Sequence, residues 1–491
     1  MPKRDILPIG HSINSKETTD MEKITKKIKA NQSGTLSFKH KIGYGLGDAA
    51  GCMTFAIMGS TFTMFCTDAL NINTNLLGIL LMVWNVWDFI NDPIMGAFMD
   101  KSFAKSRNPD GKFRPWIIAS APSVFLSFIA LWVVPSFFDG IATIIALFIL
   151  KILYEASYTM FNIPMGSLLS SMADNDKDRA SLSSARGFGS AVGNVLPTLI
   201  LPPLIKAYGS TEYGGYAIGA SICALIGLYF AIAHYHFTEE RVEVASSSAE
   251  ADNIKITDIL NVFRVNRPFL ALCIHGVFIC MMQYVGNTLV NYMFSVVYND
   301  LNLVSYGTIV SMPIMMVTFV FGPMLAKKFG LEKFIRFGLI VGSITYIALF
   351  GLHMVCYVNP YIHIVVSNFA LGLASMSIYM QWGLVGEAID YNEMITGKRT
   401  EGSIYGAFNL ARRVGQTIGN SAAVFLLGWI GYNAQLPQQT EGTITGIKVL
   451  CVLLPGIFVL GSWAAFKFIW NMDDEARARL AEFKASKKNK V

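Results

Sequence analysis

Long apolar stretches are the feature of this 491-residue sequence that most restricts its fold. A helix that crosses a bilayer needs about 20 mostly apolar residues, because the hydrocarbon core is about 30 Å thick. Twelve such stretches can be placed, six before and six after one long polar segment. They lie at 43–67, 76–100, 115–137, 140–168, 182–206, 214–237, 269–297, 305–326, 333–355, 360–386, 403–431 and 444–471. The sequence therefore predicts an all-α membrane protein with twelve transmembrane helices.

The composition agrees with a protein whose main partner is the lipid bilayer. Charged residues make up 15% of the chain and hydrophobic residues 53%, whereas about a quarter of a soluble protein is charged. The net charge of +6 is modest, so we expect no nucleic-acid partner. The seven cysteines lie inside apolar stretches, outside any CxxC or Cys/His cluster. They predict neither a disulfide framework nor a zinc site.

Polar segments divide the chain into five predicted parts. These are an N-terminal tail (1–40), a six-helix half (41–237), a central loop (238–268), a second six-helix half (269–472) and a C-terminal tail (473–491). A small residue and a basic cluster close the second helix of both halves, as at Gly96 and Gly322. Such a repeat is typical of transporters built from related halves, and it predicts the major-facilitator fold.

The distribution of Lys and Arg predicts the orientation in the membrane. The loops 68–75, 136–140, 207–213, 298–304, 356–360 and 432–443 contain neither residue, while the alternate loops are basic. Positive residues mark the cytoplasmic side. Residues 1–40 lack the apolar segment of a cleavable signal. We therefore expect a multi-pass protein of the bacterial inner membrane with both termini and the central loop in the cytoplasm.

Three polar side chains within the stretch 76–100 predict a cation site. Ionisable groups at membrane depth are costly, so they are candidates for function. Asp88, Asn91 and Asp92 are spaced i, i+3, i+4 and share one helical face. Carboxylate and amide oxygens suit Na⁺, with Asp88 and Asp92 as its acidic ligands, or suit H⁺ if one acid is protonated. The alternative is that Asp92 only caps or pairs at a helix end.

The stretch 140–168 carries a second polar stripe. Tyr158 and Asn162 suit a sugar, because pyranose rings stack on aromatic side chains and amides both donate and accept hydrogen bonds. Thr159 points between this stripe and the stretch 76–100. Lys151 and Glu155 can pair with each other, and Glu155 is otherwise a candidate proton site.

Further polar residues at depth extend the predicted substrate site. Arg186 in the first half, and Asn409 and Arg413 in the second, should face one central cavity. Trp382 offers an aromatic surface for a sugar, although an interfacial position is its alternative.

The sequence lacks the motifs of common catalytic and nucleotide sites. It has no GxxxxGK[ST], no HExxH and no GxSxG in a strand–turn–helix context. We expect a transporter rather than an enzyme, with no cofactor besides a coupling ion. The alternatives are a polytopic glycosyl or acyl transferase and an uncoupled facilitator. The carboxylates Asp88 and Asp92 argue against the facilitator.

Several motifs resemble the glycoside–pentoside–hexuronide:cation symporter family, over nearly the whole chain. They include Tyr44-Gly-Leu-Gly-Asp48, Trp87-Asp-Phe-Ile-Asn-Asp-Pro-Ile-Met-Gly96, Tyr158-Thr-Met-Phe-Asn-Ile-Pro164, Asp390-Tyr-Asn-Glu393 and Arg412-Arg-Val-Gly-Gln416. The resemblance implies a symporter that imports a sugar with Na⁺ or H⁺ by alternating access. We expect it to act as a monomer.

The resemblance also implies roles for single residues. The family's cation site matches Asp88, Asn91, Asp92 and Thr159, and its sugar site matches Tyr158, Asn162, Arg186 and Arg413. Its cytoplasmic gate matches Arg179, Glu387, Asp390, Glu393 and Arg399.

Departures from the family bear on the sugar. Galactoside carriers of the family have charged or aromatic residues where this chain has Gly51, Cys52, Asn162 and Gly166, which favours the glucuronide and pentoside branch. Since Asn162 is neutral, a ligand carboxylate could partner the arginines. This favours a hexuronide slightly, with Glu155 as the alternative partner of the arginines.

Overall fold

The computed structural model describes residues 36–105, 111–173, 176–241, 265–397 and 401–488, and its regular elements in these ranges are all helices. The predicted tail 1–40 and central loop 238–268 lie mostly outside the described residues.

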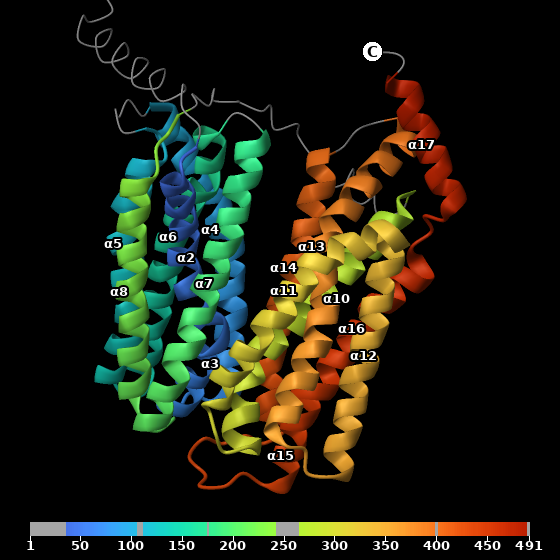
Figure 1. Ribbon diagram of the computed structural model, residues 1–491. Helices are drawn as coiled ribbons and strands as arrows, with labels where there is room; N and C mark the ends of the chain where they lie inside the picture. The colour runs from blue at the N-terminus through green and yellow to red at the C-terminus, as the bar shows by residue number, and fades with distance from the viewer. Residues whose placement is uncertain (1–35, 106–110, 174–175, 242–264, 398–400, 489–491) are drawn as a thin grey trace, which may run out of the picture.

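The helices gather in two bundles (Figure 1). The first contains α2 (Phe38–Ser60), α3 (Phe62–Met64), η1 (Phe65–Ala69), α4 (Thr74–Lys105), α5 (Arg114–Val133), η2 (Val134–Phe137), α6 (Ile141–Met172), α7 (Asp176–Tyr208) and α8 (Tyr213–Phe237). The second contains α10 (Arg267–Tyr292), η3 (Met293–Val297), α11 (Leu303–Phe329), α12 (Leu331–Val355), α13 (Pro360–Thr396), α14 (Glu401–Trp429), α15 (Glu441–Lys448), η4 (Val449–Leu453), α16 (Leu454–Ala464) and η5 (Ala465–Ile469). A last helix, α17 (Asp474–Lys488), follows it.

Eight helical segments among the described residues are long and apolar enough to cross a membrane. They belong to α5, α6, α7, α8, α10, α12, α13 and the run from α15 to η5. A ninth results if α2 and the segment Phe62–Ala69, bent by 48° to each other, form one broken span. Polar groups such as Asp88 in α4 and Arg413 in α14 lower the hydropathy of those helices. The predicted number of twelve therefore stays a prediction.

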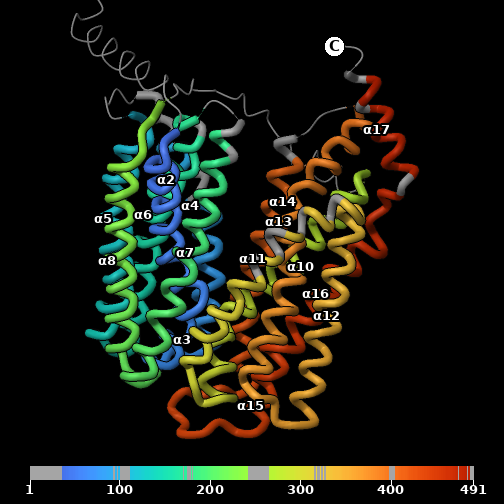
Figure 2. Tube along the Cα trace, in the orientation of Figure 1, coloured from blue at the N-terminus to red at the C-terminus, as the bar shows by residue number. Residues whose placement is uncertain are grey.

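The two bundles meet at one end of the molecule and diverge toward the other (Figures 1 and 2). We call the end where α2 begins and α17 lies the tail end, and the opposite end, near α3 and α15, the far end. The helices of each bundle run alternately toward the two ends. Since α5 separates them, α4 and α6 both begin at the far end and run parallel toward the tail end.

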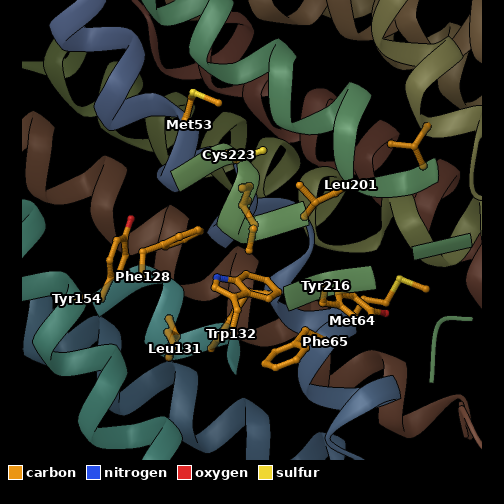
Figure 3. Close-up of a cluster of buried hydrophobic side chains, with 14 of the residues drawn as sticks. Met53, Met64, Phe65, Phe128, Leu131, Trp132, Tyr154, Leu201, Tyr216 and Cys223 are labelled. Carbon is orange, nitrogen blue, oxygen red and sulfur yellow. The ribbon is translucent and has the colours of Figure 1, made fainter. Parts of the chain in front are cut away.

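Aromatic packing fixes the far end of the first bundle. The Phe65 ring lies 4.8 Å from that of Trp132 and 5.4 Å from that of Tyr216, measured between centroids. These side chains come from η1, α5 and α8 and form one buried cluster, shown in Figure 3. Burial of such rings is a large apolar contribution, so η1 has a rigid support beneath it.

Small residues let α2 and α7 approach until their backbones touch. A Cβ built at Gly189 would lie 1.9 Å from the carbonyl oxygen of Gly45, and one at Gly193 would lie 2.4 Å from that of Ala49. Close approach through glycine is a common device of membrane helix pairs. Here it sets the polar residues of α2 beside those of α7.

Candidate functional site

The predicted cation residues lie at the contact between α4 and α6. The Asn91 side-chain amide donates a hydrogen bond of 3.0 Å to the Thr159 hydroxyl, and both residues are buried. Asp88 lies half-buried one turn before Asn91. The side chain of Asp92 lies outside what the structure describes. The structure thus brings an amide and a hydroxyl together between α4 and α6, with the Asp88 carboxylate one helical turn away along α4.

The stripe along α6 divides into an ion pair and a part that carries Tyr158 and Asn162. The Lys151 ammonium donates to the Glu155 carboxylate, and this salt bridge joins two residues one helical turn apart. This pairing is one of the two possible roles that the sequence gave for Glu155. Tyr158 stacks on Phe55 of α2 with ring centroids 6.2 Å apart. Farther along, the Asn162 side chain is exposed.

The position of Gly51 shows what α2 contributes to this region. A Cβ at Gly51 would lie 3.9 Å from the Tyr158 hydroxyl oxygen. Glycine therefore leaves space beside the tyrosine, at a place where the family's galactoside carriers have a larger residue. The polar group on the α2 side is instead Asp48, one turn earlier.

Arg186 has an acidic partner that sequence reasoning missed. Its Nε donates to the Asp48 carboxylate at 2.8 Å. Asp48 is nearly buried, with 9% of its surface exposed, whereas Arg186 is half-exposed. The sequence left a ligand carboxylate or Glu155 as the partner of the arginines, and for Arg186 the structure supplies Asp48 instead. The close contact of α2 with α7 brings these two residues together. The signal in the sequence was an acidic residue, Asp48, within an apolar stretch.

The second bundle presents an aromatic and cationic surface on α13 and α14. The guanidinium of Arg412 lies 5.5 Å from the centroid of the Trp382 ring, a cation–π distance. The same ring stacks on Tyr405 at 6.0 Å. Asn409 and Arg413 extend exposed side chains from α14. Arg412 rather than Arg413 thus holds Trp382 in place.

Tyr284 of α10 is a second residue that the sequence analysis missed. It lies within electrostatic range of Asp88 of the first bundle and of Arg412 and Arg413 of the second. Tyr158 is also within this range of Tyr284. The only signal for Tyr284 in the sequence is a polar Gln-Tyr pair inside an apolar stretch.

The predicted gate residues lie toward the tail end. Glu387 accepts a hydrogen bond of 2.9 Å from Arg477 of α17, and Arg477 also lies 3.9 Å from Glu332. Arg179 donates to the carbonyl of Ala173 at 3.1 Å. The residues Asp390 and Glu393 are half-buried on the extension of α13 beyond the predicted end at 386, and Arg399 lies outside the described residues. Arg477 is a partner that the sequence did not indicate.

Hydrogen bonds join the two bundles at the far end. The Tyr432 hydroxyl lies 3.0 Å from each Asp68 carboxylate oxygen, to which it donates. The hydroxyls of Thr67 and Tyr292 are 2.7 Å apart. Lys206 and Asp300 form a further cross-bundle ion pair at 2.8 Å. Asp68 is only 2% exposed, so the far end is closed around a buried acid.

Comparison with known proteins decides the family. A family model described as MFS/sugar transport protein matches residues 43–473, which is most of the chain. The protein belongs to this family. It is thus a multi-pass membrane transporter, and the resemblance drawn from its motifs is confirmed.

Individual relatives align with this chain along almost their whole length. The chain is 27% identical to the glucuronide carrier protein homolog of Escherichia coli (strain K12), covering 89% of this chain and 92% of the relative. It is 28% identical to a protein of Bacillus subtilis (strain 168) named as an uncharacterized symporter, and the match covers 90% of this chain and 93% of the relative. Among solved structures, a D-xylose-proton symporter superposes with a TM-score of 0.60 at 15% identity. The superposition covers 89% of this chain and 98% of the symporter, and at this identity it shows the fold alone.

Proposed function

We propose that this transporter is a secondary active symporter that imports a glycoside, pentoside or hexuronide together with Na⁺ or H⁺. The observation that carries the proposal is the buried Asn91–Thr159 hydrogen bond beside Asp88. It joins the acidic face of α4 to the helix that bears Tyr158 and Asn162. A cation held at this contact and a sugar held one turn away would share α6.

Because the cation and the sugar would both contact α6, binding of one ligand would favour binding of the other. A cation at Asp88, Asn91, Asp92 and Thr159 would offset buried negative charge and fix α6 against α4. Tyr158 and Asn162 would then be ordered before the sugar arrives, which gives positive coupling between the two ligands. Arg186, Trp382, Asn409 and Arg413 complete the sugar site in this proposal.

Alternating access follows from the arrangement of the bundles. The far end is joined by the Asp68–Tyr432 and Lys206–Asp300 contacts, while the bundles diverge toward the tail end. The basic residues at the tail end support its assignment to the cytoplasm. The structure then corresponds to an inward-facing state in the inner membrane. Adding α4, α11 and α14 to the nine candidate spans gives the proposed twelve.

The class of sugar is less restricted than the sequence suggested. Asp48 already offsets the charge of Arg186, so recognition of a ligand carboxylate would rely on the arginines of α14. A relative named for glucuronide supports a hexuronide, and glycosides and pentosides stay within the proposal.

The test is uptake of labelled sugars by proteoliposomes that contain the full chain. An inward Na⁺ or H⁺ gradient should drive accumulation above the external concentration, and Asp88→Asn should abolish accumulation while leaving exchange of sugar. Asp139→Asn, a loop acid outside the site, is the matched control. Uptake that only equalises concentrations, whatever the gradient, would show a facilitator instead.

A further inference from the structure

The Lys151–Glu155 pair is a buried ion pair for which the proposed transport cycle has no role so far. Lys151 is 7% exposed, and the two residues share α6 at i, i+4 spacing. Buried pairs often contribute little to stability, because desolvation of both charges offsets their attraction. Stabilisation of the fold alone is therefore a weak reason for the pair, and a role in transport is the alternative.

The depth of the pair follows from the contact between α4 and α6. The Asn91–Thr159 hydrogen bond sets these two residues at one level, and both helices run in the same direction. Because a helix rises about 1.5 Å per residue, Asp88 lies about 4.5 Å and Glu155 about 6 Å closer to the far end. Asp88 and Glu155 are thus nearly level, with Lys151 one turn beyond.

The ammonium of Lys151 is surrounded by groups from three elements. Glu155 accepts its hydrogen bond within α6, and the ring of Tyr154 lies 5.8 Å from its Nζ atom. Asp88 of α4 and Cys66 of η1 lie within electrostatic range of this ammonium. Lys151 therefore has two carboxylates within its electrostatic range, and one of them belongs to the proposed cation site.

We propose that Lys151 is a tethered cation that competes with the coupling ion for Asp88, and that Glu155 holds Lys151 while the ion is bound. The inference rests on the proposed function and names how its cation site is regulated. Without an ion, the ammonium, which has three donors, alternates between Glu155, where the structure places it, and Asp88. An ion that reaches Asp88 displaces Lys151 fully onto Glu155, so the site avoids an uncompensated acid in either state.

The charge balance predicts opposite effects for two variants. In Glu155→Gln, Lys151 keeps its charge but loses its alternative partner, so it stays on Asp88 and opposes the ion. In the double variant Lys151→Met/Glu155→Gln, the competitor is gone and both charges of the α6 pair are removed together. The double variant should therefore bind the ion more tightly than Glu155→Gln, and at least as tightly as the natural chain.

The experiment measures the Na⁺ concentration and the H⁺ concentration that give half-maximal sugar uptake in proteoliposomes. Glu155→Gln should raise the value for the coupling ion about tenfold, within the usual range for coupled sites, and the double variant should restore or lower it. Glu475→Gln/Arg479→Met removes an exposed i, i+4 pair from α17 and should leave the value unchanged. Immunoblots and sugar binding would show that every variant is folded.

Each other outcome overturns a defined statement. If the natural chain responds to an ion but both α6 variants keep its half-maximal concentration, the pair is structural and the inference is wrong. The same holds if the double variant is as impaired as Glu155→Gln. If uptake by the natural chain is indifferent to both ions, the proposed symport itself fails, and the inference fails with it.

Discussion

Removal of one hydroxyl at the far end should open the closed side of the transporter. Tyr432 donates to both carboxylate oxygens of Asp68 across the bundles at 3.0 Å, and Asp68 is almost inaccessible to solvent. Tyr432→Phe removes this donor and keeps the aromatic ring. Because Thr67 still donates to Asp68 at 2.7 Å, the acid keeps one partner, and the fold of η1 should persist.

The size of the effect follows from the kind of bond that is lost. A hydrogen bond to a charged group contributes about 1.5–3 kcal/mol. Since about 1.4 kcal/mol corresponds to a factor of ten, the ratio of open to closed far ends should rise about tenfold to a hundredfold. The bond exists only while the bundles touch, so its whole contribution acts on that equilibrium.

Thiol labelling from the far side measures the opening. Thr74→Cys places a reporter at the inter-bundle contact, because a Cβ on Gly428 would lie 2.2 Å from the Thr74 hydroxyl oxygen. The exposed Cys356 is the internal reference. With an impermeant maleimide and site-resolved mass spectrometry, Tyr432→Phe should raise the labelling rate at position 74 about tenfold or more relative to Cys356. An unchanged ratio would refute a gating role for the Tyr432–Asp68 contact.

Three further changes test other parts of the structure. Gly189→Ala should abolish most folded protein in detergent size-exclusion profiles, because its Cβ would meet the Gly45 carbonyl oxygen at 1.9 Å, whereas Gly187→Ala, with nothing within 4 Å, should be tolerated. Asp48→Asn should raise the half-saturating sugar concentration about fivefold, since a partly exposed pair contributes about 1 kcal/mol; an unchanged value would show that Asp48 does not position Arg186. Arg477→Gln should speed hydrogen exchange in α17, because the bonds to Glu387 and Glu332 are lost, and Arg479→Gln, which breaks only an exposed pair, should not.

Local periodicity was enough to predict that Asp88 and Asn91 share one face of α4. The family resemblance implied that Thr159 belongs with them, and the structure places Thr159 against Asn91. Helix ends were harder. The apolar stretch 360–386 marks the membrane-spanning part of α13, but the helix continues to Thr396, since a helix needs no apolar residues once it leaves the bilayer.

Pairings between distant segments could not be predicted in the same way. Tyr432 and Asp68 are 364 positions apart, and each lies at the end of an apolar stretch, where polar residues are common for interfacial reasons. Arg477 lies in a segment that composition marks as a polar tail, yet the structure places it on Glu387. Their partners depend on how whole helices pack, which hydropathy does not encode.

The pairing of Arg186 with Asp48 shows how backbone packing bears on the choice of substrate. Glycines at 189 and 193 bring α2 against α7, and this contact places a carboxylate within 2.8 Å of the arginine. A guanidinium that already has a carboxylate gains less from a ligand acid than an uncompensated one would. The first bundle then contributes hydroxyl, amide and aromatic contacts suited to the neutral part of a sugar. Recognition of a charged sugar would then depend on α14, where Arg412 lies against the Trp382 ring and Arg413 is exposed. If this division holds, substitutions in α14 should change the preference between glucuronides and neutral glycosides, and Asp48→Asn should weaken both equally.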